Sequence, residues 1–304
     1  MDETVAIQLQ DLSKTFGRGE KSIQAVRNLN LEIEAGQVYG FLGPNGAGKT
    51  TTIRMIMTLI RPSHGRVHVY GQDVQQHPEV LKRVGALVEG PAFYGYLSGY
   101  ENLEVLARTA NDYRPQQITN LLQQVGLANG AHRKVSNYSL GMKQRLGIAA
   151  ALLSDPDLII LDEPTNGLDP AGIKEMRQFI RSLASQQGKT VFLSSHMLNE
   201  VEQTCDRVAI IHQGQLIREG AVTDLLAEKT KLRIQASPLD KAAEILQGHW
   251  GVSASEGWLM VNAAAEDSPG IVRHLVEQGI SVYQAIVERQ SLEDYFMTVT
   301  KLGA

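Results

Sequence analysis

The feature that most constrains this chain is a glycine-rich turn between a strand-like and a helix-like segment. Residues Gly43 to Thr50 match the pattern G-x-x-x-x-G-K-[ST]. The apolar run Val38 to Leu42 predicts a buried strand before the turn, and Thr50 to Ile60 predict a helix that ends before Pro62. Glycines let several backbone N–H groups face one centre, and the helix N-terminus adds its positive dipole end. The sequence therefore predicts a phosphate-binding loop in an α/β fold.

Two side chains of this loop and two later carboxylates carry the chemistry that a nucleotide requires. Lys49 brings a positive charge to the phosphates, and Thr50 offers a hydroxyl to Mg²⁺. The strand-like run Leu158 to Leu161 is followed by Asp162 and Glu163. At the C-terminal edge of a parallel sheet, Asp162 is predicted to orient Mg²⁺ and Glu163 to polarise the attacking water. Such a pair also occurs in solvated turns and helix caps, and the phosphate loop favours the catalytic interpretation.

The order of apolar runs predicts a mostly parallel α/β core, with antiparallel strands before about Glu34. Short continuous runs such as Thr190 to Leu193 and Arg207 to Ile211 suit strands that are buried on both faces. Residues from about 90 to 154 predict a helical insertion. Its helices are expected at Glu101 to Ala110, Ile118 to Val125 and Leu140 to Leu153.

The pattern changes after Gly220, and we expect an ATP-binding domain over residues 1–222 and an accessory domain over 223–304. The predicted elements of the second domain follow the order β-α-β-β-α-β, which is typical of a ferredoxin-like fold. A last amphipathic helix is predicted from Ser291 to Val299.

Composition limits the partners of this chain. A hydrophobic content of 43% and a charged content of 20% are ordinary for a soluble globular protein. The net charge of -4 provides no basic field, so no nucleic-acid partner is expected. The longest apolar stretch, near Leu146 to Leu153, is too short to span a bilayer, so a membrane role requires another chain. Cys205 is the only cysteine, which excludes an intrachain disulfide.

Several further segments resemble the nucleotide-binding subunits of ABC transporters, in the same order along residues 5 to 220. Asn137 to Arg145 resembles the signature segment, and Asn166 to Asp169 resembles the D-loop. His196, after Ser194 and Ser195, resembles the switch histidine, and Phe16 lies where the family places an aromatic residue to stack on adenine. The co-linear order makes this resemblance more specific than any single motif.

The resemblance implies a P-loop ATPase that pairs head to tail with a second, identical copy and sandwiches two ATP molecules. Catalysis is expected from Glu163 and His196, and Mg²⁺ ligation from Thr50, Asp162 and Glu89. ATP contacts are expected from Phe16, Gly43, Pro44, Asn45, Gly46, Ala47, Gly48, Lys49, Thr50, Thr51, Ser139, Gly141 and Asp169. The resemblance also implies a separate transmembrane permease and a cytoplasmic location at the inner face of the cell membrane.

The chain departs from the usual family pattern at three positions. Glu89 stands where the family usually has a glutamine, Leu140 replaces a signature glycine, and Met142 replaces a signature glutamine. Glu89 and its surroundings resemble the branch that exports bacitracin-like and lantibiotic peptides. The leading hypothesis is thus the ATPase of such an exporter.

Two alternatives are a soluble ABC-type ATPase of translation or DNA repair, and a regulatory or sensor module with little turnover. The first usually has two ATPase halves or an inserted coiled coil, and neither is recognisable here. Glu163 argues against the second, because a module without turnover need not keep the base.

Overall fold

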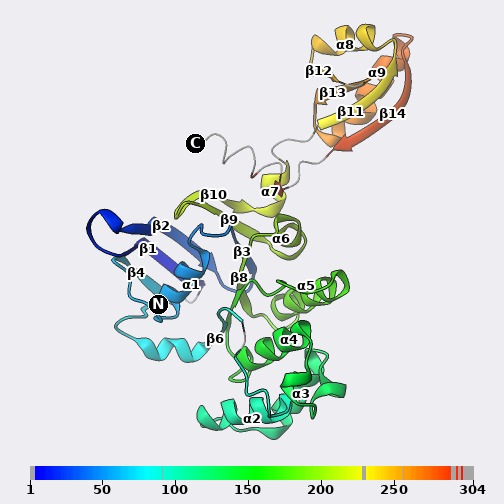
Figure 1. Cartoon of the computed structure of the whole chain (residues 1–304). Coiled ribbons are helices and arrows are strands. Elements are labelled where there is room, and N and C mark those ends of the chain that lie inside the picture. Colours follow the sequence, from blue (N-terminus) through cyan, green and yellow to red (C-terminus); the bar gives the residue numbers. More distant parts are fainter. Residues whose placement is uncertain are drawn as a thin grey trace. The chain divides into compact units, whose positions relative to one another are not determined.

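The computed structural model describes residues 4–90, 92–227, 231–255, 257–288, 292, 293 and 296. Its contacts divide the chain into a first unit, Met1–Gly220, and a second unit, Ala221–Ala304 (Figure 1). The described helices include none of the length and apolarity that a bilayer span requires.

The first unit is built on a six-stranded sheet with the order β10-β9-β3-β8-β7-β6. Strands β3, β6, β7, β8 and β9 pair in parallel. Every residue of β3, β7 and β8 is buried. Helices and a four-stranded antiparallel sheet, described next, cover the two faces of these strands. The strand bounds are β3 Val38–Leu42, β6 Val84–Leu87, β7 Leu158–Asp162, β8 Thr190–Ser195, β9 Arg207–His212 and β10 Gln215–Ala221.

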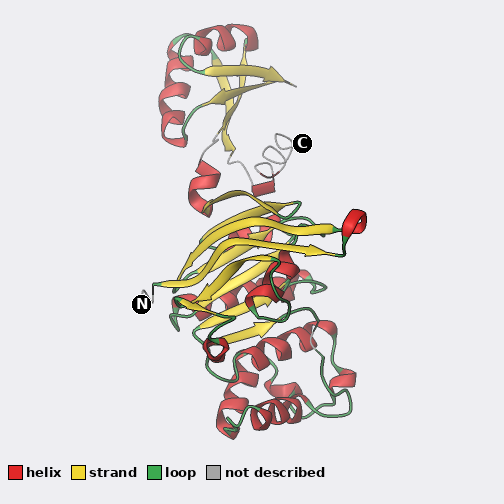
Figure 2. Cartoon of the chain, turned by 90° about the vertical axis from the view of Figure 1, so that its left-hand side faces the viewer, coloured by secondary structure: helices red, strands yellow, loops and turns green. Residues whose placement is uncertain are grey.

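A four-stranded antiparallel sheet with the order β2-β1-β4-β5 packs over helix α1 (Figure 2). Its strands are β1 Val5–Phe16, β2 Ile23–Glu34, β4 His64–Val69 and β5 Gln72–Asp73. Helix α1, Lys49–Ile56, contributes the buried Ile53 and Met55 to a core shared with Ile7 and Phe41. Each such buried side chain stabilises the fold by about 1.5–3 kcal/mol.

Helices α2 Gly99–Thr109, α3 Pro115–Gln124 and α4 Leu140–Ala151 form the segment between β6 and β7. Ser98 and Glu101 form a capping box at the start of α2, which satisfies backbone N–H groups that lack a helical partner. Helices α5 Pro170–Ser185 and α6 Leu198–Thr204 pack against β3. The 3₁₀ helices of this unit are η1 Gly19–Lys21, η2 Pro78–Arg83, η3 Ala128–Gly130 and η4 Val135–Asn137.

The second unit begins with helix α7, Val222–Ala227, and continues as a β-α-β-β-α-β module. Its sheet has the order β12-β13-β11-β14 with antiparallel pairs, and apolar residues of α8 and α9 form its core with the sheet. This arrangement confirms the predicted ferredoxin-like fold. The elements are β11 Lys231–Ser237, α8 Leu239–Gln247, β12 Gly251–Ser255, β13 Trp258–Asn262, η5 Ala265–Asp267, α9 Ser268–Glu277 and β14 Ser281–Glu288.

Helix α1 is shorter than the sequence predicts. Helix α1 ends at Ile56 rather than at Ile60, because Thr58 adopts a positive φ of 56°, which a continuing helix does not allow. The predicted helix from Ser291 to Val299 lies mostly outside the described residues.

The single cysteine, Cys205, is buried in the first unit. Burial raises the pKa of its thiol, so the thiol stays protonated at neutral pH.

Candidate active site

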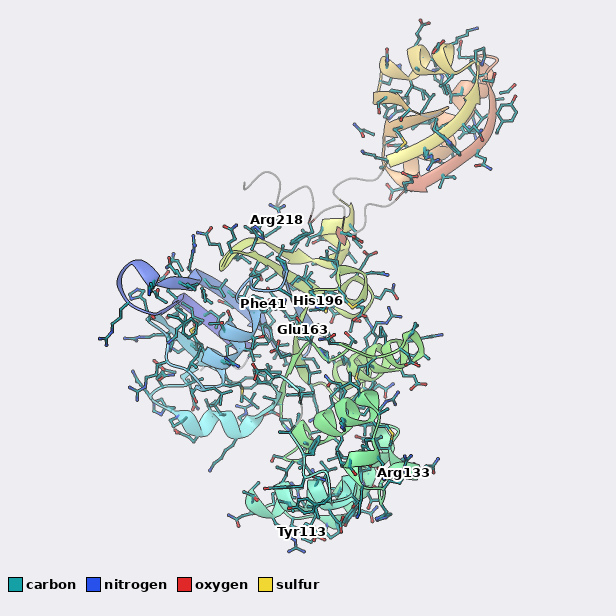
Figure 3. All side chains as sticks on the ribbon, viewed as in Figure 1. Phe41, Tyr113, Arg133, Glu163, His196 and Arg218 are labelled. Carbon is teal, nitrogen blue, oxygen red and sulfur yellow. The ribbon has the colours of Figure 1, made fainter. Side chains whose placement is uncertain are left out.

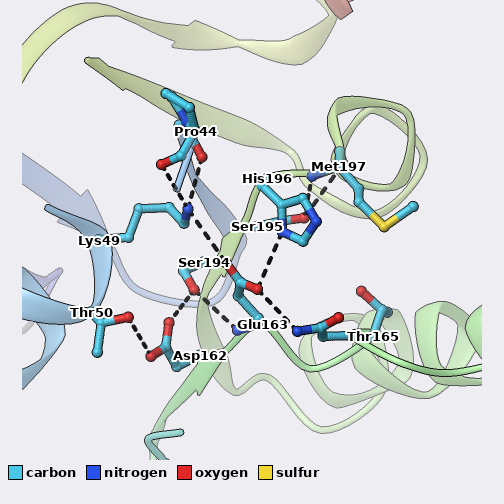
Figure 4. Close-up of polar contacts among 12 residues, drawn as sticks. Pro44, Lys49, Thr50, Asp162, Glu163, Thr165, Ser194, Ser195, His196 and Met197 are labelled. Carbon is cyan, nitrogen blue, oxygen red and sulfur yellow. Dashed lines mark hydrogen bonds and ion pairs between the residues drawn. The ribbon is translucent and has the colours of Figure 1, made fainter. Parts of the chain in front are cut away.

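The glycine-rich loop joins β3 to α1 and folds around the ammonium group of Lys49. Lys49 is 5% exposed, and its Nζ donates to the carbonyl oxygens of Gly43 at 2.8 Å and Pro44 at 3.3 Å (Figure 4). Gly48 has a φ of 104°, and a Cβ there would lie 2.5 Å from the carbonyl oxygen of Ala25. Only glycine fits this position, and it lets the chain turn directly into α1.

The end of β7 meets the start of α1. The Thr50 hydroxyl donates to Asp162 Oδ2 at 2.8 Å, and the Ser194 hydroxyl donates to Asp162 Oδ1. Ser194 Oγ also accepts the backbone N–H of Glu163 at 3.0 Å. These contacts arise because β7 and β8 pair in parallel with Asp162 opposite Ser194, so both strands end at the same edge of the sheet.

The carboxylate of Glu163 is held by three side chains. Oε1 lies 3.4 Å from Lys49 Nζ, and Oε2 lies 3.2 Å from His196 Nδ1 and 3.4 Å from Asn166 Nδ2. Figure 3 shows Glu163 and His196 near the centre of the first unit. Glu163 is partly exposed at 23%, so water can reach it while its orientation is restrained. This arrangement suits a carboxylate that accepts a proton from water.

A cavity of about 400 Å³ opens beside these groups. It is lined by Thr50, Glu89, Gly90, Leu140, Gln144, Asp162, Glu163, Asn166 and Gly167. We call this space the carboxylate cavity. Glu89 follows the end of β6 by two residues, and its carboxylate pairs with the guanidinium of Arg54 on α1. Arg54 therefore compensates the negative charge that Glu89 adds to the cavity.

A second cavity, of about 630 Å³, contains the predicted residues of the signature segment and the D-loop. Ser139, Gly141 and Asp169 line it, and we call it the signature cavity. Ser139 caps α4 by accepting the N–H of Met142 at 3.2 Å, and Asp169 caps α5 by accepting the N–H of Gly172 at 2.9 Å. Ser139, Gly141 and Asp169 thus line the signature cavity and not the carboxylate cavity, although Leu140 and Gly167 line both.

The other predicted contact residues lie in or near the loop, except Phe16. Asn45, Gly46 and Ala47 form the loop itself, and Thr51 lies in the first turn of α1. Phe16 ends β1 with its side chain 42% exposed, and Lys14 Nζ lies 5.1 Å from its ring centroid. Phe16 lines neither cavity.

Three residues of the site have roles that the sequence analysis does not assign. Ser194 fixes Asp162, Asn166 contacts Glu163, and Arg54 pairs with Glu89. Arg54 follows Thr50 by four residues, and this helical spacing is a signal that places both on one face of α1. The contact of Ser194 depends on strand register, for which the sequence carries no signal.

Comparisons with known proteins agree with this geometry. The ABC transporter family model matches residues 26–166. The chain is 43% identical to the bacitracin transport ATP-binding protein BcrA of Bacillus licheniformis, over 96% of each chain. It is 41% identical to the lantibiotic transport ATP-binding protein SrtF of Streptococcus pyogenes, over 70% of this chain and 90% of SrtF.

A solved structure of an ATP-binding cassette, dimeric in a post-hydrolysis state with ADP and Pi, has a TM-score of 0.64. It is 27% identical and covers 71% of this chain and 98% of the cassette. The predicted fold class is therefore confirmed. The chain belongs to the ABC transporter family, as an ATP-binding subunit that hydrolyses ATP to power transport.

Proposed function

We propose that this chain hydrolyses Mg-ATP as one half of a head-to-tail pair of identical copies and thereby drives peptide-antibiotic export through a separate permease. The observation that carries the catalytic part is the network around Glu163. Lys49, His196 and Asn166 contact its carboxylate, and Thr50 and Asp162 meet beside it. The base and the metal-binding oxygens thus line one cavity, and the cation Lys49 contacts the base.

In the proposed reaction, the oxygen of a water molecule forms a bond with the γ-phosphorus, and the bond from that phosphorus to the β–γ bridging oxygen breaks. Glu163 accepts the proton of the water, and His196 holds the second oxygen of the same carboxylate. Lys49 is placed to neutralise negative charge on the β- and γ-phosphates. ADP and inorganic phosphate then leave.

The oxygen donors of the site fit Mg²⁺, which binds through one or two protein oxygens together with phosphate oxygens. Thr50 and Asp162 would hold it, since both present oxygen atoms to the carboxylate cavity. When bound, the ion neutralises charge on the phosphates. Among the described residues, no three His, Cys, Asp or Glu side chains cluster as a metal site of their own. Glu89 is a weaker candidate ligand, because Arg54 already pairs with it.

The position of Ser139 outside the carboxylate cavity supports the head-to-tail pair. Ser139 and the N-terminal amides of α4 form an anion-binding end that lines the signature cavity and not the carboxylate cavity of the same copy. We infer that they contact the γ-phosphate held by the second copy. Solved relatives of this family include dimeric cassettes. Each working site would then need both copies.

The substrate class rests on the relatives. BcrA and SrtF are named as bacitracin and lantibiotic transport proteins, and the match to BcrA extends over both units of this chain. This coverage gives no support to a soluble factor or sensor. We infer that a transmembrane permease anchors the chain at the inner face of the cell membrane.

The test is Glu163→Gln, which keeps the shape of the side chain and removes its basicity. We expect turnover to fall by about 10² or more while ATP still binds, because general-base catalysis contributes that much. In cells that carry the chain and its permease, the variant should also lose protection against a bacitracin-type peptide. Glu34→Gln, at an exposed position of β2, is the control. Normal turnover in Glu163→Gln would remove Glu163 as the base.

A further inference from the structure

Glu200 is a buried carboxylate that the proposed reaction does not use. It lies on α6 and is only 7% exposed. Its Oε2 accepts a hydrogen bond from the hydroxyl of Thr165, and its Oε1 has no hydrogen-bond partner among the described residues. An ionised carboxylate with one unpaired oxygen is costly to bury. Its presence at this position therefore requires an explanation.

The small space beside Glu200 is lined by both apolar and polar side chains. Ile180, Leu193 and Val201 lie there together with Arg177, Ser195 and Thr204. Replacing both members of a buried polar pair by apolar groups of similar shape is often neutral or stabilising. The contact between Thr165 and Glu200 is thus poorly explained by stability alone.

Both partners of this contact lie close to the catalytic pair along the chain. Thr165 follows Glu163 by two residues, in a turn closed by the N–H of Asn166 donating to the Glu163 carbonyl oxygen at 3.1 Å. Glu200 follows His196 by four residues, at the start of α6. The two segments are therefore joined twice. Glu163 contacts His196, as Figure 4 shows, and Thr165 hydrogen-bonds to Glu200.

We propose that Glu200 and Thr165 are positioning residues. Their hydrogen bond keeps the carboxylate of Glu163 next to the imidazole of His196. This inference rests on the proposed role of Glu163 as the base. The second connection restrains the turn that carries Glu163, which has a positive φ of 49°, a conformation that a non-glycine residue adopts only when its surroundings hold it there. Without the connection, the carboxylate would sample positions from which proton transfer is slower.

The first experiment replaces both partners together, as Thr165→Val and Glu200→Met. The double variant removes the hydroxyl and the carboxylate without leaving either unpaired, so its melting temperature should equal or exceed that of the wild type. We expect kcat to fall about tenfold while the KM for ATP changes less than twofold, since misplaced catalytic groups slow the chemical step. A double variant with wild-type kcat would overturn the proposal.

Single variants provide matched controls. Thr165→Ser keeps the hydroxyl and Glu200→Gln keeps an acceptor oxygen, so each should retain most of the turnover. Thr165→Val alone should lose both turnover and stability. A purely structural role predicts that turnover returns with stability in the double variant, and that outcome would also contradict the proposal.

A further set of variants distinguishes the positioning role of Thr165 and Glu200 from the role of Glu163 as the base. In a Glu163→Gln background, the Thr165→Val and Glu200→Met changes should cause no further loss of turnover, because they act through that carboxylate. A further tenfold loss would refute positioning of Glu163. Normal turnover in Glu163→Gln alone would instead refute the base, and it is measured independently of Thr165 and Glu200.

Discussion

At the scale of single residues, the charge around the carboxylate cavity depends on Glu89 and Arg54. Glu89 adds a negative charge beside the predicted phosphate position, and Arg54 neutralises it. Both side chains are substantially exposed, at 57% and 38%, so the pair contributes little to folding. Its effect should appear in nucleotide binding, where the uncompensated carboxylate would repel phosphate.

Arg54→Ala is therefore expected to weaken ATP binding by about fivefold, because an uncompensated charge several ångströms away costs about 1 kcal/mol in water. Adding Glu89→Gln should restore the affinity, since it removes the repelling charge. Titration with a fluorescent ATP analogue would measure both effects.

The control for this pair is Arg108→Ala, which breaks the exposed ion pair with Glu104 on α2 and should leave ATP affinity unchanged. If Arg54→Ala with Glu89→Gln binds ATP no better than Arg54→Ala alone, the compensation model is wrong.

At the scale of elements, the site depends on strands that end together. Strands β3, β7 and β8 pair in parallel and carry the loop, Asp162 and Ser194 at their C-terminal ends. Strand β6 extends the same edge toward Glu89, and it packs closely against the end of α4. A Cβ on Gly85 would lie 1.9 Å from the carbonyl oxygen of Ala151. The close approach of β6 and α4 thus requires glycine.

Gly85→Ala should destabilise the first unit by about 1–3 kcal/mol, because overpacking forces backbone atoms apart. Thermal or urea unfolding of the whole chain would measure the loss. Gly95→Ala is the matched control, since a Cβ there meets only Ser136 at an ordinary 3.7 Å. Equal unfolding midpoints for the two variants would show that β6 and α4 are not constrained in this way.

At the scale of the whole molecule, the proposed head-to-tail pair implies that one copy holds two half-sites. The carboxylate cavity and the signature cavity are lined by different predicted groups, although Leu140 and Gly167 contribute to both. A head-to-tail pair would complete each site with one cavity from each copy. Certain mixtures of inactive variants should therefore regain activity.

Lys49→Ala damages the loop and Ser139→Ala damages the signature segment, so either variant alone should have little turnover. A mixed pair of these variants contains one doubly damaged site and one intact site. An equal mixture should recover about a quarter of the wild-type turnover if pairs form at random and the two sites act independently.

The control mixture combines Lys49→Ala with Glu163→Gln. Both changes lie on the same half-site. Each composite site of a mixed pair therefore carries one of the two substitutions, and no turnover should return. Equal activity in the two mixtures would contradict the shared site, because sites contained within one copy cannot complement each other.

Much of the fold follows from local patterns in the sequence. Continuous apolar runs such as Leu158 to Leu161 predict buried parallel strands, and the order of elements after Gly220 predicts the ferredoxin-like module. The end of α1 was not predictable from its apolar pattern. That pattern continues to Ile60, whereas Thr58 takes a left-handed conformation.

The sequence alone determined the phosphate loop and the identity of the acids, because eight consecutive residues and one strand end carry that information. Which side chains meet depends on the folded structure. The contacts of Thr50 with Asp162, Arg54 with Glu89, and Thr165 with Glu200 join residues 112, 35 and 35 positions apart. Strand order and register bring the segments that carry these side chains together. Both depend on packing across the whole sheet rather than on any local run of residues.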